Sequence, residues 1–305
     1  MEPLDGWRFW WGHAAFMAIV FRFHLLVGLV VCAAGVGWLA LGRGKIAAAS
    51  LAGCAIVPAL VCWWPVSRVP DGRPTILIMS ANLLYSRADF VSIRRQIEEH
   101  TPDMVLFQEF TPDAQAALGD WLRGVYPHYF EHAQEGAYGQ AVYSRLSLAG
   151  PPRVMPPGLE VPQVTLRLNW EGRPLSLTNV HLYSPVVSQA HAHRTQAARL
   201  ASWLESLDRA GGDVVAAGDW NATWHTPHMA RLANAGFHES HEACGVGRGS
   251  TWPRVTALAF APGIRIDHVV YNAGLECIEA WVGDDVSSDH APVFARLARR
   301  PIAAR

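Results

Sequence analysis

The sequence predicts an α/β domain in which two mixed sheets pack together with helices outside, preceded by a helical hairpin that crosses a membrane. The apolar excess lies before residue 67 and marks a boundary. After it, short apolar runs alternate with amphipathic segments, and several of these runs are separated by tight turns. Many strands with few helices argue against a strictly parallel, doubly wound sheet and favour two packed sheets.

Two uncharged runs, residues 25–41 and 46–66, are close to the length of about 20 residues that spans a bilayer. We therefore expect transmembrane helices at about 23–41 and 46–66, joined by the basic turn at 42–45. Residues 7–23 are rich in Trp and Phe but are interrupted by charge, which favours a helix lying in the membrane interface. A third short span and buried soluble helices are the alternatives. The predicted domains are a membrane anchor at 1–70 and a catalytic domain at 71–305.

Basic connectors tend to stay in the cytoplasm, so the turn at 42–45 predicts that the catalytic domain lies on the exocytoplasmic face of the cell membrane. Arg8, Arg22, Arg68 and Arg73 weaken this bias. After residue 70 there are 20 Lys/Arg and 24 Asp/Glu, so the domain is net negative. Nucleic-acid binding usually needs a basic surface, and we do not expect a nucleic-acid partner.

The catalytic domain contains a series of predicted elements. Strands are expected at 75–81, 104–107, 139–144, 163–170, 175–182, 214–217, 266–271, 275–282 and 293–297, and helices at 89–100, 115–123, 190–207 and 229–235. The turn at 171–172 predicts a hairpin. Leu200, Trp203, Leu204 and Leu207 share one helical face.

Five cysteines form no metal-binding pattern. Cys32, Cys54 and Cys62 lie in apolar runs and behave as small hydrophobic residues. Cys244 and Cys277 could pair in an oxidising compartment, but their spacing does not decide this.

Polar side chains recur where the predicted strands begin or end. They are Asn82, Glu109, His181, Asp219, Asn221, Asp267, Asp289 and His290. Strand ends of packed sheets converge on one rim, and such rims bind ligands. We therefore expect these residues to form one site.

Their chemistry suits hydrolysis of a phosphorus ester by water. Glu109, with Asn82 and Asp289, offers the oxygen ligands that Mg²⁺ prefers. His290 is a candidate base, with Asp267 to orient its ring. His181 and Asn221 can donate to phosphoryl oxygens as charge builds. The sequence contains no nucleophile elbow, Walker loop or zinc-type spacing.

Five motifs together resemble the endonuclease/exonuclease/phosphatase superfamily, which includes deoxyribonuclease I, abasic-site endonucleases, neutral sphingomyelinases and inositol-polyphosphate 5-phosphatases. They are QE at 108–109, N-x-H-L-x-S-P at 179–185, GDWNAT at 218–223, RIDHV at 265–269 and SDHAP at 288–292. Their order and spacing match across about residues 74–298. The resemblance implies a four-layer α/β sandwich.

The resemblance also implies roles for the matching residues. Glu109, helped by Asn82, resembles the principal metal ligand, and Asp289 a second metal or water contact. His181 resembles the residue that contacts phosphate. Asp219, with Asn221 beside it, resembles the residue that positions or activates water, and Asp267 and His290 the carboxylate–imidazole pair. Whether Asp219 or His290 is the base stays open.

Arg194 resembles a substrate-binding position more weakly, and the alternative is that it is only an exposed helix residue. The expected cofactor is Mg²⁺, with Mn²⁺ as the alternative.

An anchor followed by this domain resembles membrane-tethered bacterial members that hydrolyse lipid-linked pyrophosphates and are associated with glycopeptide resistance. The leading expectation is a lipid phosphate or pyrophosphate substrate at the membrane. A sphingomyelinase-like phosphodiesterase and a nuclease of the same superfamily are the alternative enzymes. The non-enzyme alternative is a tethered binding module without activity. Oligomeric state is not predicted.

Overall fold

The computed structural model describes residues 72–86, 89–155, 161, 163–185, 189–247, 249–254 and 263–301. The predicted membrane anchor lies outside these residues. None of the helices that the structure describes is long and apolar enough to cross a bilayer.

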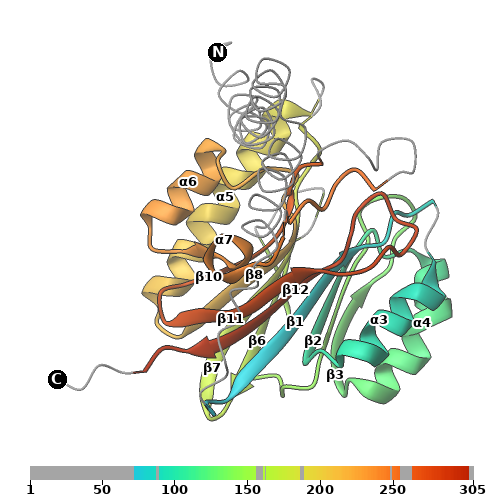
Figure 1. Cartoon of the computed structure of the whole chain (residues 1–305), viewed down its shortest axis with the longest axis horizontal. Helices are drawn as coiled ribbons and strands as arrows, with labels where there is room; N and C mark the ends of the chain where they lie inside the picture. Colours follow the sequence, from blue (N-terminus) through green and yellow to red (C-terminus); the bar gives the residue numbers. More distant parts are fainter. Residues whose placement is uncertain are drawn as a thin grey trace, which may run out of the picture.

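Two six-stranded mixed sheets form the centre of the domain (Figure 1). The first sheet has the order β11 (Leu275–Val282), β12 (Val293–Arg299), β1 (Thr75–Asn82), β2 (Met104–Gln108), β4 (Gln140–Ser144) and β3 (His128–His132). The second has the order β5 (Arg153–Met155), β6 (Gln163–Trp170), β7 (Arg173–His181), β8 (Asp213–Asp219), β10 (Asp267–Tyr271) and β9 (His238–Glu239). Parallel pairing joins β1 to β2 and β7 to β8, and the other pairs are antiparallel.

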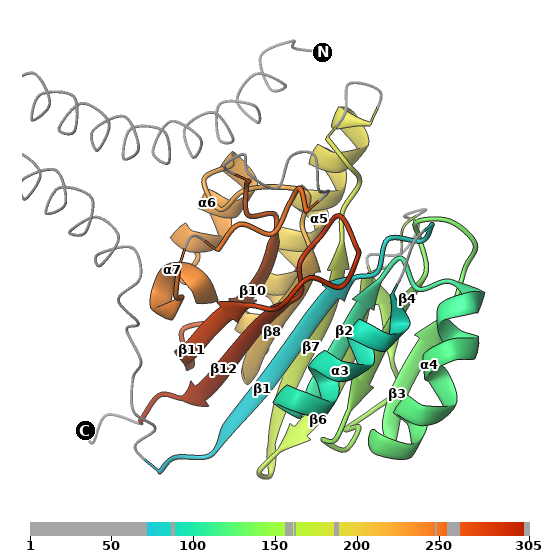
Figure 2. The same ribbon diagram turned by 45° about the vertical axis from the view of Figure 1, so that its right-hand side comes forward.

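Helices cover the outer face of each sheet, which gives four layers. The first sheet carries α3 (Phe90–His100) and α4 (Pro112–Val125), and the second carries α5 (Ala190–Arg209) and α6 (Pro227–Asn234) (Figures 1 and 2). Alternation along the strands explains the layering. In β1, Ile76 and Ile78 belong to the core between the sheets, whereas Leu77 and Met79 pack in the cluster that includes α3 and α4. The predicted α/β sandwich is confirmed.

Several short elements were not predicted from the sequence. They are the strands β3, β5 and β9 and the short helix α7 (Ser240–Cys244). Each has too few apolar residues at regular spacing for its secondary structure to be predicted from hydrophobic periodicity. Helix α4 begins at Pro112, earlier than expected, because Thr111 accepts a hydrogen bond from Ala114 N and Pro112 suits the first helical position.

Cys244 of α7 and Cys277 of β11 form a disulfide. This result decides the pairing that spacing alone left open. The bond ties α7 to the edge of the first sheet, since β11 lies at that edge.

Candidate active site

Strand register brings three of the predicted residues side by side in the second sheet. His181 ends β7 opposite Asp219, and Asp219 ends β8 opposite Asp267, the first residue of antiparallel β10. In the first sheet, Asn82 ends β1 opposite Gln108, which precedes Glu109. These strand ends form one rim of the sandwich.

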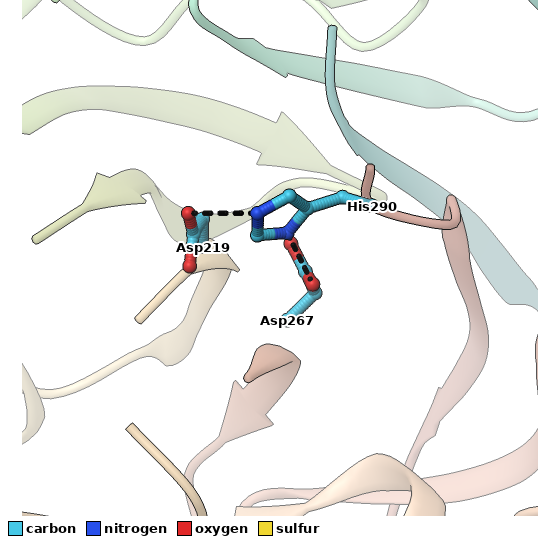
Figure 3. A group of neighbouring side chains, drawn as sticks. All are labelled: Asp219, Asp267 and His290. Carbon is cyan, nitrogen blue, oxygen red and sulfur yellow. Dashed lines mark hydrogen bonds and ion pairs between the residues drawn. The ribbon is translucent and has the colours of Figure 1, made fainter. Parts of the chain in front are cut away.

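His290 lies between two carboxylates at this rim (Figure 3). Its Nδ1 is 2.9 Å from Asp267 Oδ2, and its Nε2 is 3.8 Å from Asp219 Oδ2. Burial lowers the pKa of His290, but Asp267 and Asp219 outweigh burial and raise the pKa to about 10. Burial raises the pKa of Asp219 to about 6, although His290 opposes the rise. At neutral pH the imidazole is therefore cationic and Asp219 is anionic.

Glu109 and Asp219 share a hydrogen-bond donor. Asn82 Nδ2 donates to both Glu109 Oε1, at 3.2 Å, and Asp219 Oδ2, at 3.1 Å. The backbone N–H of Tyr85 donates to Glu109 Oε2 at 2.9 Å. Burial raises the pKa of Glu109, and the charge of Asp289 adds to the rise. In this arrangement Asn82 links two carboxylates, while its own Oδ1 accepts from Leu84 N.

His181 is within reach of both carboxylates. Its Nε2 is 3.7 Å from Asp219 Oδ2 and 4.0 Å from Glu109 Oε1. Burial lowers the pKa of His181, so the ring is neutral at pH 7 and can donate a hydrogen bond. Its backbone is held from both sides by the Gln163 side chain, which accepts from His181 N at 2.8 Å and donates to His181 O at 2.7 Å.

The GDWNAT turn presents Asn221 beside Asp219. Asn221 N donates to Asp219 Oδ1 at 2.8 Å, and its Nδ2 reaches Leu182 O at 2.9 Å and Asp219 Oδ2 at 3.1 Å. Asn221 has a positive φ of 47°, a conformation that Asn tolerates well. Gly218 has φ 150°, and a Cβ there would lie 1.9 Å from Val180 O. The turn therefore requires glycine at this position.

A buried polar bridge between the sheets supports the rim and was missed from the sequence. Asn179 in β7 donates to Phe107 O and Ala141 O of the first sheet at 2.8 and 3.2 Å. Gln108 Nε2 donates to Asn179 Oδ1 at 2.6 Å and to Ser80 Oγ at 3.1 Å. Both residues stand in the quoted motifs, so their types were a usable signal, but only the packing of two sheets shows that they meet.

Asp289 and Arg194 are less closely tied to the rim. Asp289 is partly exposed, and its Oδ2 accepts from Trp252 Nε1 at 3.2 Å. Arg194 lies partly buried near the start of α5. None of the hydrogen bonds or ion pairs among the described residues joins Arg194 to the rim, so its predicted role in substrate binding stays a prediction.

The donor set fits a divalent cation. Four carboxylates, from Glu109, Asp219, Asp267 and Asp289, accompany one cationic imidazole, so the rim carries excess negative charge. Asp219, Asp267 and His290 each place a ligand atom within 4.8 Å of the others. A cation held by that trio would compete with the Asp267–His290 hydrogen bond. Among the described residues, the Glu109 carboxylate has no cationic neighbour within 4 Å other than His181, whose pKa is lowered by burial, and it is a second candidate ligand for a hard cation.

The α/β sandwich and the carboxylates and histidines at its rim are typical of the phosphoesterase class of proteins. Residues 79–290 match the Endonuclease/Exonuclease/phosphatase family model. Because the match covers more than half of the chain, the protein belongs to that family. No curated protein sequence matches the chain.

Solved structures share the fold at low identity. Humanised TDP2 from D. rerio is 19% identical, with a TM-score of 0.60 over 73% of this chain and 98% of that one. The Neisseria 3′ phosphatase NExo bound to a DNA hairpin is 18% identical, with a TM-score of 0.59 over 72% and 98%. The Bacteroides thetaiotaomicron mannosyl-6-phosphatase Bt3783 is 16% identical, with a TM-score of 0.59 over 73% and 99%.

Proposed function

We propose that this protein is a membrane-anchored, divalent-metal-dependent hydrolase that cleaves a lipid-linked phosphate or pyrophosphate by direct attack of water. The observation that carries the chemistry is the Asp219–His290–Asp267 arrangement beside Glu109. Asp219 accepts a proton from the attacking water, because its pKa of about 6 leaves it anionic at neutral pH. The His290 cation, held by Asp267, balances negative charge on the phosphoryl oxygens.

The remaining side chains bind and orient the substrate. His181 is a donor close to Asp219, where phosphoryl oxygens would lie. Asn221 holds Asp219 in place through its backbone N–H and Nδ2, and would donate to a phosphoryl oxygen only by releasing Asp219 Oδ2. Glu109, assisted by Asp289, would hold Mg²⁺ or Mn²⁺. A bound cation would polarise a phosphoryl oxygen and offset the charge of the carboxylates.

Three observations support a lipid substrate at the outer face. The sequence supplies two uncharged runs of membrane-spanning length before the domain. The domain is net negative, which disfavours a phosphate backbone as substrate. The Cys244–Cys277 disulfide is typical of an oxidising compartment.

A hydrolysis panel tests the proposal. Full-length protein in detergent is assayed with Mg²⁺, Mn²⁺ or EDTA for release of inorganic phosphate from a lipid pyrophosphate, release of phosphocholine from sphingomyelin and cleavage of plasmid DNA. We expect turnover of the lipid pyrophosphate only with a metal. Faster turnover of sphingomyelin would favour the phosphodiesterase alternative. Two structural neighbours, TDP2 and NExo, were crystallised with DNA, so faster turnover of DNA would favour a nuclease.

The metal assignment is tested with Glu109→Gln. Loss of this carboxylate should raise the Mg²⁺ concentration for half-maximal activity by about tenfold or more. Glu99→Gln, an exposed position on α3, is the matched control and should leave the Mg²⁺ titration unchanged. An unchanged titration in Glu109→Gln would remove Glu109 from the metal site.

A further inference from the structure

A small groove lies on the outer face of the second sheet, away from the rim. It encloses about 150 Å³ and is lined by residues that include Arg153, Thr165, Arg167, Ser176, Trp203 and Leu207. In β6, Val164, Leu166 and Leu168 face the core between the sheets. Because side chains alternate along a strand, Thr165 and Arg167 face outward, and the C-terminal half of α5 supplies Trp203 and Leu207 as a wall.

Strand register gathers cationic and hydroxyl groups in this groove. Arg153 of β5 pairs with Thr165, and Arg167 pairs with Ser176 of β7. Directly paired residues point to the same face of a sheet. Two guanidinium groups and the partly exposed Ser176 hydroxyl are therefore presented together on one outward surface, next to the buried Thr165.

The two arginines stand out because other arginines near this end of the sheets are neutralised. Arg173 lies 3.8 Å from Asp213 Oδ1, and Arg299 lies 2.6 Å from Asp213 Oδ2. Arg153 and Arg167 are exposed, and neither takes part in an ion pair among the residues that the structure describes. Their positive charge stands out on a domain that is net negative overall.

The walls of the groove are fixed by hydrogen bonds. Trp203 Nε1 donates to Thr165 Oγ1 at 3.2 Å, and Thr165 Oγ1 lies 2.9 Å from Thr178 Oγ1. These bonds hold the indole ring in place beside the guanidinium groups. An oxyanion could bind the arginines while an attached apolar group packs on Trp203 and Leu207.

We propose that this groove is a second binding site, for the phosphate group of a small organic ligand. Guanidinium groups match phosphate oxygens in geometry and charge. Ser176 lies five residues before His181 on β7, or about 17 Å along the strand, so the groove is distinct from the rim. The phosphate could come from a free phosphorylated molecule or from an anionic lipid headgroup, and the proposal does not depend on the proposed activity.

Nuclear magnetic resonance of the arginine side chains tests the site. Full-length protein labelled with ¹⁵N-arginine is kept in neutral detergent with EDTA, and the Nε–H signals of Arg153 and Arg167 are assigned with the single variants. The probes are inorganic phosphate and a short-chain phosphatidylglycerol. We expect saturable shifts of both signals in the parent. The Arg153→Gln/Arg167→Gln double variant lacks both signals, and its affinity for each probe, measured by isothermal titration calorimetry beside the parent, should be weaker by about tenfold or more.

The controls separate the site from the rim and from misfolding. Arg199→Gln is exposed on α5 outside the groove and should bind as the parent does. The double variant should unfold at the same urea concentration as the parent, which shows that it is folded. Saturation by inorganic phosphate identifies a free phosphate as the ligand class, and saturation by phosphatidylglycerol alone identifies a headgroup. The absence of saturable shifts with both probes, or equal affinity in the double variant, would overturn the proposal.

Discussion

In the proposed mechanism the base is Asp219 and not His290, although an imidazole with an ordinary pKa would be the more usual base. An isolated His has a pKa near 6.5 and is the usual candidate for proton abstraction at neutral pH. Here Asp267 and Asp219 raise the pKa of His290 to about 10, despite burial, so the ring keeps its proton. Burial raises the pKa of Asp219 to about 6, which is close to the operating pH that favours a general base.

This assignment predicts a particular pH profile for the metal-loaded enzyme. The value of kcat/KM should rise as Asp219 loses its proton near pH 6 and fall as His290 loses its proton near pH 10. Asp267→Asn removes a carboxylate that raises the pKa of His290, so the upper limb should move to lower pH. The maximal rate should fall by about 100-fold, a typical loss for a disturbed acid–base group.

The measurement is kcat/KM for phosphate release from pH 5 to 10.5, with Glu135→Gln as a control that changes charge at an exposed position. If His290 were the base instead, activity would require its neutral form. The rate would then continue to rise toward pH 10, and such a profile would reverse the assignment.

At the scale of elements, the sequence predicts well what depends on short-range pattern. The apolar runs of β1, β2, β6, β7 and β8 are long enough to be recognised, and the polar residues at their ends mark the rim. Strand β3 could not be predicted, because His-Tyr-Phe-Glu-His mixes polar and aromatic residues without a clear period.

Properties that depend on residues that are close in space but distant in sequence could not be predicted from the sequence. The choice between Asp219 and His290 depends on burial and on charges distant in sequence. The Asn179 bridge depends on contact between two sheets. The pairing of Cys244 with Cys277 depends on where α7 packs, since the chain between them contains β10.

Gly218 offers a prediction about the element that carries Asp219. In Gly218→Ala the added Cβ would lie 1.9 Å from Val180 O, at a φ that L-residues rarely adopt. Either β8 or β7 must shift, and we expect the free energy of unfolding to fall by roughly 2–4 kcal/mol, with loss of activity.

Gly124→Ala is the matched control for urea unfolding. Gly124 lies in the last turn of α4, and a Cβ there meets open space. Because Ala has the higher helix propensity, this variant should unfold at an equal or higher urea concentration. Its free energy of unfolding should rise by at most about 1 kcal/mol. Equal stability of the two variants would show that the GDWNAT turn accepts a side chain.

At the scale of the whole molecule, the point where the chain enters the sandwich constrains how the rim could reach a membrane. The chain enters β1 at Thr75, beside Ala298 near the end of β12, and the rim begins at Asn82 at the other end of the same strand (Figure 2). Seven steps along a strand correspond to about 23 Å. The proposed anchor is therefore joined to the end of the domain farthest from the catalytic rim.

The linker length then decides whether the rim can approach lipid. Residues 67–74, which separate the second apolar run from β1, can span at most about 28 Å when fully extended. That reach is only slightly greater than the length of β1, so the domain can turn its rim toward the bilayer only when the linker is almost fully extended. The fully extended linker exceeds the length of β1 by only about 5 Å.

Deleting residues 67–71 should therefore separate activity on membranes from activity in solution. We expect phosphate release from a lipid pyrophosphate in vesicles to fall by about tenfold or more, because the residues that remain span only about 11 Å and cannot let the rim turn toward the bilayer. Turnover of a soluble phosphoester should keep the parent rate. An insertion of five Gly/Ser residues at the same point is the matched control and should preserve or increase the rate on vesicles, since a flexible linker of this length adds reach. Equal rates on vesicles for the deletion, the insertion and the parent would show that the rim does not act on lipid in the bilayer that holds the proposed anchor.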